Sequence, residues 1–383
     1  MTTLDTDPAD AGREERVRAE VRLATLFGMG PTLRKRLVER CGSAAAVFST
    51  PPETLASVPG VGRRLAQAIA EAAASPEADE IIAVCRRQGV AIVSPGMDDY
   101  PALLTRIDDP PSPLFVRGDI VPADALAIAV VGARHATPYG IRTATRLAGG
   151  LARAGYTIVS GLARGIDAAA HRGALEAGGR TLAVLGSGVL AIYPPEHEGL
   201  AAQVAAQGAV LAEVPPLAAP CRGAFPQRNR IIAGLVLGVV VVEAGDRSGS
   251  LITARLAADQ GREVFAVPGQ IDCTMARGCH RLIRDGARLV ESVDDVLEEL
   301  GPLFETTTTS SGRTISAPAE LRLDDVERRT LDAVDGQLVS GVAAIDDVVA
   351  ASGLATAQVL ATLGVLEMRR LIRRLPGNRV ART

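Results

Sequence analysis

Short apolar runs alternate with helical segments between Glu80 and Leu300 of this chain. The runs are rich in valine, leucine, isoleucine and alanine, which predicts buried strands. The predicted strands are Ala91–Ser94, Leu114–Arg117, Ala127–Val131, Tyr156–Ser160, Thr181–Leu185, Val210–Glu213, Leu237–Glu243 and Glu263–Val267. Because helical stretches separate the later strands, we predict an α/β domain over residues 80–300, with a parallel sheet covered on both faces.

The segment before this domain, residues 17–79, has a helical pattern with a weak internal repeat. Leu26–Gly42 and Val58–Ala72 each place Gly-x-Gly before a basic amphipathic helix. This is the helix-hairpin-helix layout, in which the N–H groups of the turn accept a DNA phosphate. A small helical module whose glycines only make tight turns would give the same pattern, so both interpretations stay open.

The two ends of the chain complete the predicted organisation. Residues 1–16 are polar and are predicted to be a disordered leader, and residues 301–320 contain the low-complexity linker "ETTTTSSGRTISAP". Residues 321–383 read as a helix, a turn at Gly353, a second helix and a basic hairpin around Pro376-Gly377-Asn378. That order predicts a winged helix, a module that binds either DNA or protein.

Composition narrows the classes of function. The chain has 383 residues, 47% of them hydrophobic but only 3% aromatic, and a net charge of -3. Such a length predicts two or three domains, and the charge excludes a protein-wide basic field for nucleic acid. Lys35 is the only lysine, so any local anion site depends on arginine, whose planar fork binds phosphate bidentately.

Cysteines and apolar runs indicate the compartment. The five cysteines include no CxxC pair, which is typical of reduced cysteines in a cytosolic protein. A zinc site on Cys273, Cys279 and His280 would lack a fourth spaced ligand, so we expect no metal. The longest apolar run, Ile231–Val242, is shorter than the ~20 residues of a membrane helix, and no signal core precedes it. We therefore expect a cytoplasmic protein without a membrane partner.

Glycine-bearing loops follow the predicted strands. They are Val131–Arg134, Ser160–Gly165, Gly186–Gly188, Ala244–Ser250 and Pro268-Gly269. In a parallel sheet these loops meet at one edge, where Arg134 and Arg164 would help to form a groove for a polyanion. No loop reads GxGxxG or GxxxxGK[ST], so neither a dinucleotide cofactor nor a Walker-type ATPase is expected.

A second informative stretch is "FPQRNR", residues 225–230. Phe225 offers a face for an unpaired base, Arg228 and Arg230 suit phosphates, and Asn229 suits a base edge. Alternatively, the stretch is a helix N-terminus whose arginines pair with Glu213 or Glu243.

The successive motifs "YPALLTRIDDPPSPLFVRGD", "AVVGARHATPYG", "IVSGLARGIDAAAHRGAL", "TLAVLGSGVLAIYPPEH", "FPQRNRIIAGL", "VVEAGDRSGSLITARLAADQGREVFAVPG" and "GCHRLIRDGA" cover Tyr100–Val290 almost continuously. In this order they resemble the DNA-processing proteins of the DprA family, also called Smf. The resemblance implies an extended Rossmann domain between a sterile-alpha-motif-like or helix-hairpin-helix module and a winged helix. It further implies a homodimer that binds and protects single-stranded DNA and hands it to the RecA recombinase in natural transformation.

Carried over onto this sequence, the resemblance implies a DNA site of glycines, arginines, one aromatic ring and a serine turn. Its residues are Arg134, Gly161, Arg164, Gly165, Phe225, Arg228, Asn229, Arg230, Ser248, Gly249 and Ser250. Two departures are Ala133, where the family often has a hydroxyl residue, and the less polar segment Gln270–Cys273. The resemblance also implies dimerisation, for which we single out the region Gly278–Glu299.

An enzymatic function is the alternative. Asp167 and His171 lie one helical turn apart, but no nucleophile or oxyanion partner is evident beside them, so we expect Asp167 to cap its helix and His171 to bond inside the domain. Related Rossmann enzymes of the lysine-decarboxylase-like group hydrolyse nucleotide N-glycosidic bonds with a helix glutamate. Here Leu251, Ile252 and Ala254 occupy the corresponding stretch, so we expect a binding protein rather than an enzyme.

Overall fold

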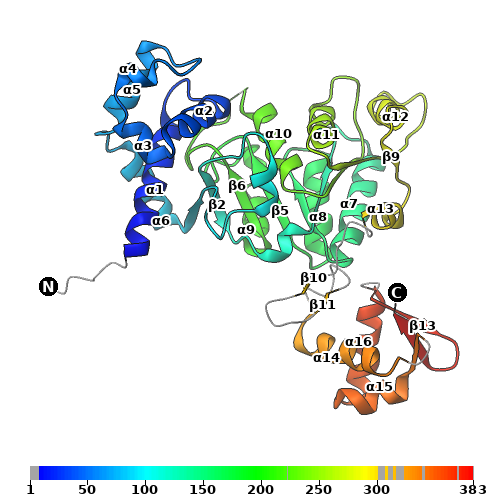
Figure 1. Ribbon diagram of the computed structural model, residues 1–383. Coiled ribbons are helices and arrows are strands. Elements are labelled where there is room, and N and C mark those ends of the chain that lie inside the picture. Colours follow the sequence, from blue (N-terminus) through cyan, green and yellow to red (C-terminus); the bar gives the residue numbers. More distant parts are fainter. Residues whose placement is uncertain are drawn as a thin grey trace.

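The structure is a computed structural model that describes residues 8–221, 223–300, 307–308, 314–315, 323–338, 341–368 and 371–382. It contains an N-terminal helical region, a central α/β domain and a small C-terminal domain (Figure 1). Among these residues no single helix has the length and apolar composition to cross a membrane; only Ile345–Ser352 and Thr356–Met368 pass together, and they are bent by 113°.

The N-terminal region differs from the prediction at its start. Residues 8–16, expected in a disordered leader, belong to helix α1 (Pro8–Thr25). Polar composition suggested disorder, but these residues continue into a helix that packs Val17 and Val21 against a buried cluster. At the surface, Arg13 pairs with Asp99 at 2.6 Å and Glu14 with Arg86 at 2.5 Å. The boundary predicted at residue 17 therefore falls inside a continuous helix.

The repeated Gly-x-Gly segments make the predicted hairpins. They precede α2 (Pro31–Cys41) and α5 (Arg63–Ala72), and the first glycine of each has a left-handed backbone, φ 84° at Gly28 and 94° at Gly60. Two short helices, α3 (Ala44–Ser49) and α4 (Pro52–Leu55), connect them, and α6 (Glu77–Gln88) leads into the sheet.

The central sheet has nine strands in the order β1-β2-β6-β5-β4-β3-β7-β8-β9. The strands are β1 (Val90–Val93), β2 (Leu114–Gly118), β3 (Ala127–Val131), β4 (Thr157–Ser160), β5 (Thr181–Leu185), β6 (Ala209–Ala212), β7 (Gly238–Val241), β8 (Glu263–Ala266) and β9 (Arg288–Leu289). Each predicted strand is present to within a few residues, and β9 was missed because two exposed residues show no pattern.

We expected a parallel sheet, but one edge of the observed sheet is antiparallel. β1 pairs with β2 and β2 with β6 in antiparallel register, whereas every pair from β6 to β9 is parallel. The physical reason is the connection: η1 (Ala102–Arg106) and loops, rather than a crossover helix, join β1 to β2, and only parallel neighbours require a crossover.

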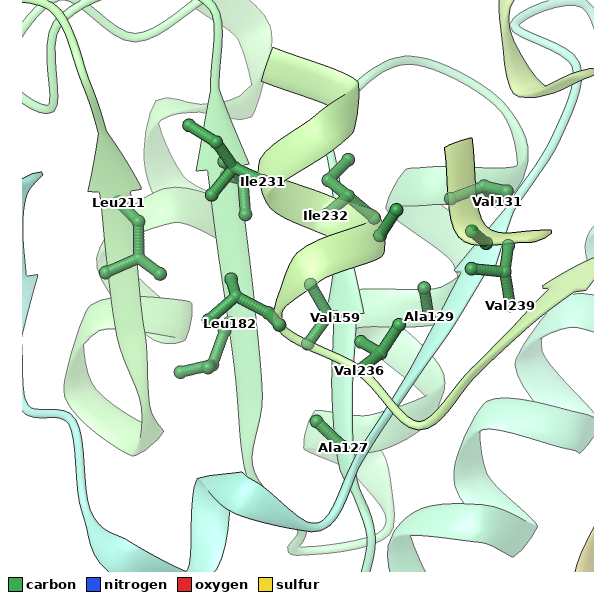
Figure 2. Close-up of a cluster of buried hydrophobic side chains, with 14 of the residues drawn as sticks. Ala127, Ala129, Val131, Val159, Leu182, Leu211, Ile231, Ile232, Val236 and Val239 are labelled. Carbon is green, nitrogen blue, oxygen red and sulfur yellow. The ribbon is translucent and has the colours of Figure 1, made fainter. Parts of the chain in front are cut away.

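Helices cover both faces of the sheet. Alternate residues of β3 face opposite sides, so Ala127, Ala129 and Val131 join one buried cluster while Ile128 and Val130 join another. Figure 2 shows the first cluster, where α10 (Ala224–Gly234) packs Ile231 and Ile232 onto the strands. Burial of each such side chain contributes roughly 1.5–3 kcal/mol, so these contacts fix the position of α10.

The helices divide between the two faces. With α10 lie α11 (Gly249–Asp259) and α12 (Arg277–Arg284). The opposite face carries α7 (Pro138–Arg153), α8 (Ile166–Glu176), α9 (Glu198–Gln207) and α13 (Val293–Leu300).

The C-terminal domain has the predicted winged-helix order. Helices α14 (Asp325–Gly336), α15 (Ile345–Ser352) and α16 (Thr356–Met368) pack on an antiparallel sheet of order β12-β14-β13. Its strands are β12 (Val342–Ala344), β13 (Ile372–Leu375) and β14 (Arg379–Arg382). Of the predicted linker, 301–320, the described residues are β10 (Thr307–Thr308) and β11 (Thr314–Ile315), which pair with each other; the remainder lies outside the described residues.

Candidate nucleic-acid interface

A cavity of about 980 Å³ opens at the carboxyl ends of the central strands. Strand β3 lies between β4 and β7, so the strand order reverses there, which is where ligands bind in open α/β sheets. We call this cavity the rim pocket. Its lining comes from the predicted loops after β3, β4 and β7 and from α10, and includes Arg134, Ala163, Asp167, Phe225, Arg228, Asn229, Ser248, Gly249 and Ser250.

The turn after β4 forms a rigid floor beside the pocket. Leu162 (φ 55°) and Gly165 (φ 75°) both have left-handed backbone, and a side chain at Gly165 would overlap the carbonyl of Ala133. The buried Asp167 carboxylate accepts a hydrogen bond from the N–H of Gly161 at 3.2 Å. Burial raises the pKa of Asp167, although Arg228 and backbone N–H groups oppose that shift. Asp167 therefore ties the turn together.

Arg228 holds the same turn from the other side. Its side chain is buried, and Nη1 donates to the carbonyl oxygens of Gly161, at 2.8 Å, and Val184. Burial lowers the pKa of this guanidinium to about 10. Because Arg228 already bonds to protein carbonyls, it positions the turn, and its positive charge lies at the wall of the pocket.

Two of the predicted pocket residues join α10 to α11. Asn229 Nδ2 donates to the carbonyl of Gly249 at 3.2 Å, and Ser248 and Ser250 bond to each other through their hydroxyls at 2.8 Å. Since α11 begins at Gly249, its free N–H groups and its positive dipole end face the pocket.

Arg230, predicted as a DNA ligand, lies elsewhere. Its side chain is 7% exposed and pairs with Glu213 at 2.5 Å and with Asp109 at 3.0 Å. This is the alternative that the sequence left open. Two residues along a helix rotate a side chain by about 200°, so Arg228 and Arg230 face opposite sides of α10.

Phe225 is the aromatic floor of the rim pocket. Its ring packs on Gly186, where an added Cβ would approach the ring to 3.0 Å, and Arg134 lies over the ring at 5.2 Å. A guanidinium above an aromatic face is a favourable cation–π contact. The structure therefore brings Phe225 and Arg134, both predicted site residues, into contact at the pocket.

Sequence reasoning missed the segment after β5 that ends in "YPPEH". Tyr193 lines the pocket, and its ring centre lies 5.9 Å from that of Phe225. Arg164, predicted to bind phosphate, pairs here with Glu196 at 2.5 Å. The signal was available, because this motif is among those that carry the resemblance, but nothing in its composition marks it as a wall of the pocket.

Asp167 and His171 each bond to other groups of the central domain. His171 is fully buried, and its Nδ1 lies 2.7 Å from Thr181 Oγ1. Because that hydroxyl donates to the carbonyl of Ile158, it accepts a hydrogen bond from Nδ1–H of His171. Burial lowers the pKa of His171 to about 3, which keeps the ring neutral. His171 therefore bonds inside the domain as predicted, while Asp167 binds the turn before its helix rather than acting as the helix cap.

The other candidates for chemistry have structural partners too. Glu243, at the end of β7, accepts hydrogen bonds from the N–H of Thr137 at 2.9 Å and from its hydroxyl at 2.5 Å. Cys279 is buried, with Sγ 3.6 Å from the carbonyl of Val241, and His280 contacts Gly269. Within the described part of the chain, no three His, Cys, Asp or Glu side chains gather as a metal site would require.

Family models match three parts of the chain. Residues 91–301 match DNA recombination-mediator protein A, residues 315–378 match the DprA winged helix domain, and residues 21–75 match a SAM-like helix-hairpin-helix tandem. These matches agree with the three regions of the structure.

Two similar proteins belong to the same family as the matched models. Protein Smf of Synechocystis is 34% identical over 93% of this chain and 96% of its own length. DNA processing protein DprA of Bacillus subtilis is 42% identical over 59% of this chain and 76% of its own.

Solved structures give the same answer. DprA of Streptococcus pneumoniae superposes with a TM-score of 0.64 and 36% identity, covering 74% of this chain and 97% of that one. DprA of Helicobacter pylori, whose structure concerns a single-stranded DNA binding mode, gives 0.51 and 28%, covering 56% and 97%. This chain therefore belongs to the DprA/Smf family of DNA recombination mediators.

Proposed function

We propose that this protein binds single-stranded DNA in the rim pocket, protects it and passes it to the RecA recombinase, in natural transformation and recombination. The observation that carries the proposal is the joint geometry of Phe225, Arg134 and the N-terminus of α11 at one cavity. An aromatic face with cations beside it is what unpaired bases on a phosphodiester chain require. The Helicobacter pylori relative, described for its single-stranded DNA binding, supports the same ligand here.

We place the principal contact in the central domain. In the helical tandem, Arg34 is occupied by Glu20 at 2.5 Å and Arg36 donates to the carbonyl of Pro59. Helix α16, the one that would enter a DNA groove in a winged helix, contains no lysine or arginine. Exposed arginines remain at Arg63 and Arg64 of α5 and at Arg373 and Arg379 of the β13–β14 hairpin, so either module could add a secondary contact to the strand.

We propose a non-enzymatic mode of action. Asp167, which lines the pocket, and Glu243, at the end of β7, are held by backbone N–H groups and a threonine hydroxyl, and α11 has no carboxylate before Asp259. Asp246, the other carboxylate that lines the pocket, is exposed on the loop before α11. The alternative, hydrolysis of nucleotide N-glycosidic bonds, requires a carboxylate that faces the sugar. Release of free base from a nucleoside monophosphate, lost on Asp246→Asn or Asp167→Asn, would contradict the proposal.

Transfer to RecA and homodimerisation rest on family membership. For the dimer, we propose the region Gly278–Glu299, where Leu289 of β9 is 46% exposed beside arginines of α12. Ile271, in the loop before α12, is 91% exposed next to it. Light scattering of the wild type and of Leu289→Asp tests this assignment. Equal masses for the two proteins would contradict it.

Fluorescence anisotropy tests the proposed ligand. A labelled oligo-dT and the corresponding duplex are titrated with wild type, Arg134→Gln and the control Arg153→Gln. Arg134 lies in the loop before α7, and the control removes an exposed arginine at the C-terminus of that helix. We expect preference for the single strand, strong salt dependence and weakening by 1 kcal/mol or more, on the order of a lost charged hydrogen bond, only in Arg134→Gln. Equal duplex binding, or equal effects of both variants, would refute the proposal.

A further inference from the structure

The segment from Tyr193 to His197 forms a wall of the rim pocket that the function described so far does not use. Tyr193 lines both the rim pocket and a small adjoining cavity that contains Arg164, and its side chain is 38% exposed. His197 anchors the segment, because it is 6% exposed and its Nδ1 lies 2.8 Å from the carbonyl of Leu162 in the turn after β4.

Tyr193 and Phe225 form an open pair of rings. Their planes are tilted by 55°, with centres 5.9 Å apart. Two rings at such an angle cannot both pack on one base, but they present two separate faces to successive bases of a bent single strand. Duplex bases, already stacked on their neighbours, have no free faces to offer, so the pair favours unpaired bases.

Glu196 occupies the edge of Arg164 that a phosphate would use. Its Oε1 lies 2.5 Å from Arg164 Nε, and the two side chains are 49% and 51% exposed. The hydrogen bond from Arg164 holds the pKa of Glu196 below its usual value, so the carboxylate stays charged. Exposed ion pairs contribute little to stability, so a competing anion can exchange with this carboxylate.

We propose that Tyr193 is a second stacking surface for an unpaired base and that Glu196 is an internal competitor, displaced from Arg164 by a backbone phosphate. The inference rests on the proposed function and extends it. The two roles act together: an isolated phosphate must displace Glu196 without the gain from stacking, whereas a polynucleotide gains both contacts. The wall thereby selects phosphodiester chains with free bases over small anions.

The stacking role is tested with oligo-dT and an abasic oligonucleotide of equal length. Tyr193→Leu should weaken oligo-dT binding roughly five- to tenfold, as expected for one lost base–aromatic contact, and leave the abasic chain unaffected. Tyr193→Phe, which keeps the ring, should retain wild-type affinity. Equal losses of Tyr193→Leu on both oligonucleotides, or a Tyr193→Phe loss as large as that of Tyr193→Leu, would overturn this role.

The competitor role is tested by a double-mutant cycle. Glu196→Gln should tighten oligo-dT binding at least threefold, and this gain should vanish in an Arg164→Ala background. Glu198→Gln is the matched control, because it removes an exposed carboxylate two residues away at the start of α9. Equal gains from Glu196→Gln and Glu198→Gln, or a gain that persists without Arg164, would overturn it.

These outcomes are separable from failure of the proposed function. If wild type does not bind the oligonucleotide, or Arg134→Gln binds as wild type does, the rim pocket is not the DNA site. If wild type binds the oligonucleotide and Arg134→Gln weakens that binding, but the Tyr193 and Glu196 variants bind as wild type does, only the role proposed for this wall is wrong.

Discussion

Replacing Arg228 by alanine should destabilise the central domain and not merely weaken DNA binding. The guanidinium is buried, donates to the carbonyls of Gly161 and Val184, and opposes the charge of buried Asp167. Its removal leaves the buried carbonyls of Gly161 and Val184 without their donor and takes a positive charge away from Asp167. Each buried acceptor left without a donor costs about 1–3 kcal/mol.

Arg134→Ala gives the contrast. Arg134 lies over Phe225 at the pocket surface, so its loss removes one cation–π contact, worth about 0.5–1 kcal/mol at an accessible site. The two substitutions should therefore have different effects. Arg228→Ala should lower the stability of the central domain, whereas Arg134→Ala should weaken DNA binding with little loss of stability.

Hydrogen exchange with mass spectrometry across a urea series measures the free energy of unfolding of the central domain alone, because peptides from β3, β4 and β5 report on that domain. A double variant, Arg228→Met with Asp167→Asn, should recover part of the loss, because no unpaired charge remains. If Arg228→Ala keeps the protection within about 1 kcal/mol of wild type yet abolishes DNA binding, Arg228 is a direct phosphate ligand and the reasoning fails.

Three further predictions follow from buried groups. Burial lowers the pKa of His171 to about 3, so on acidification the unfolded chain takes up a proton before the folded protein does. Stability should therefore fall as the pH drops from about 6.5 towards 3. The melting temperature of His171→Gln should fall less steeply over this pH range. Gly161→Ala places a methyl group on the Arg228 guanidinium, so it should weaken oligo-dT binding about tenfold in anisotropy titrations. Arg230→Met leaves Glu213 and Asp109 unpaired; burial raises the pKa of both, so its loss of melting temperature should be smaller at pH 5 than at pH 8.

The sequence predicted the sheet well because its central strands are buried on both faces. Such strands are continuous apolar runs, as in Ala127–Val131, and their bounds emerged almost unchanged. The apolar pattern does not predict strand direction, because direction depends on whether a helix or a loop joins two strands. The antiparallel edge of β1 and β2 was therefore not predictable from the apolar pattern.

The candidate site shows the same limit. Arg228 and Arg230 are indistinguishable in "FPQRNR", and only the rotation of α10 decides that one lies at the pocket while the other pairs with Glu213. Tyr193 belongs to a loop with no periodicity, so its position depends on packing against Phe225 and the turn after β4. Composition also gave the wrong structure for residues 8–16, whose partners lie far along the chain.

Crosslinking locates the bound strand most directly. An oligonucleotide carrying 5-iodouracil is irradiated with the full-length protein, and the modified peptides are identified by mass spectrometry. We predict adducts on Phe225 or Tyr193 that disappear when unlabelled oligo-dT competes. Adducts confined to residues 17–75 or 321–383 would place the strand on a terminal module and contradict the rim pocket as the DNA site.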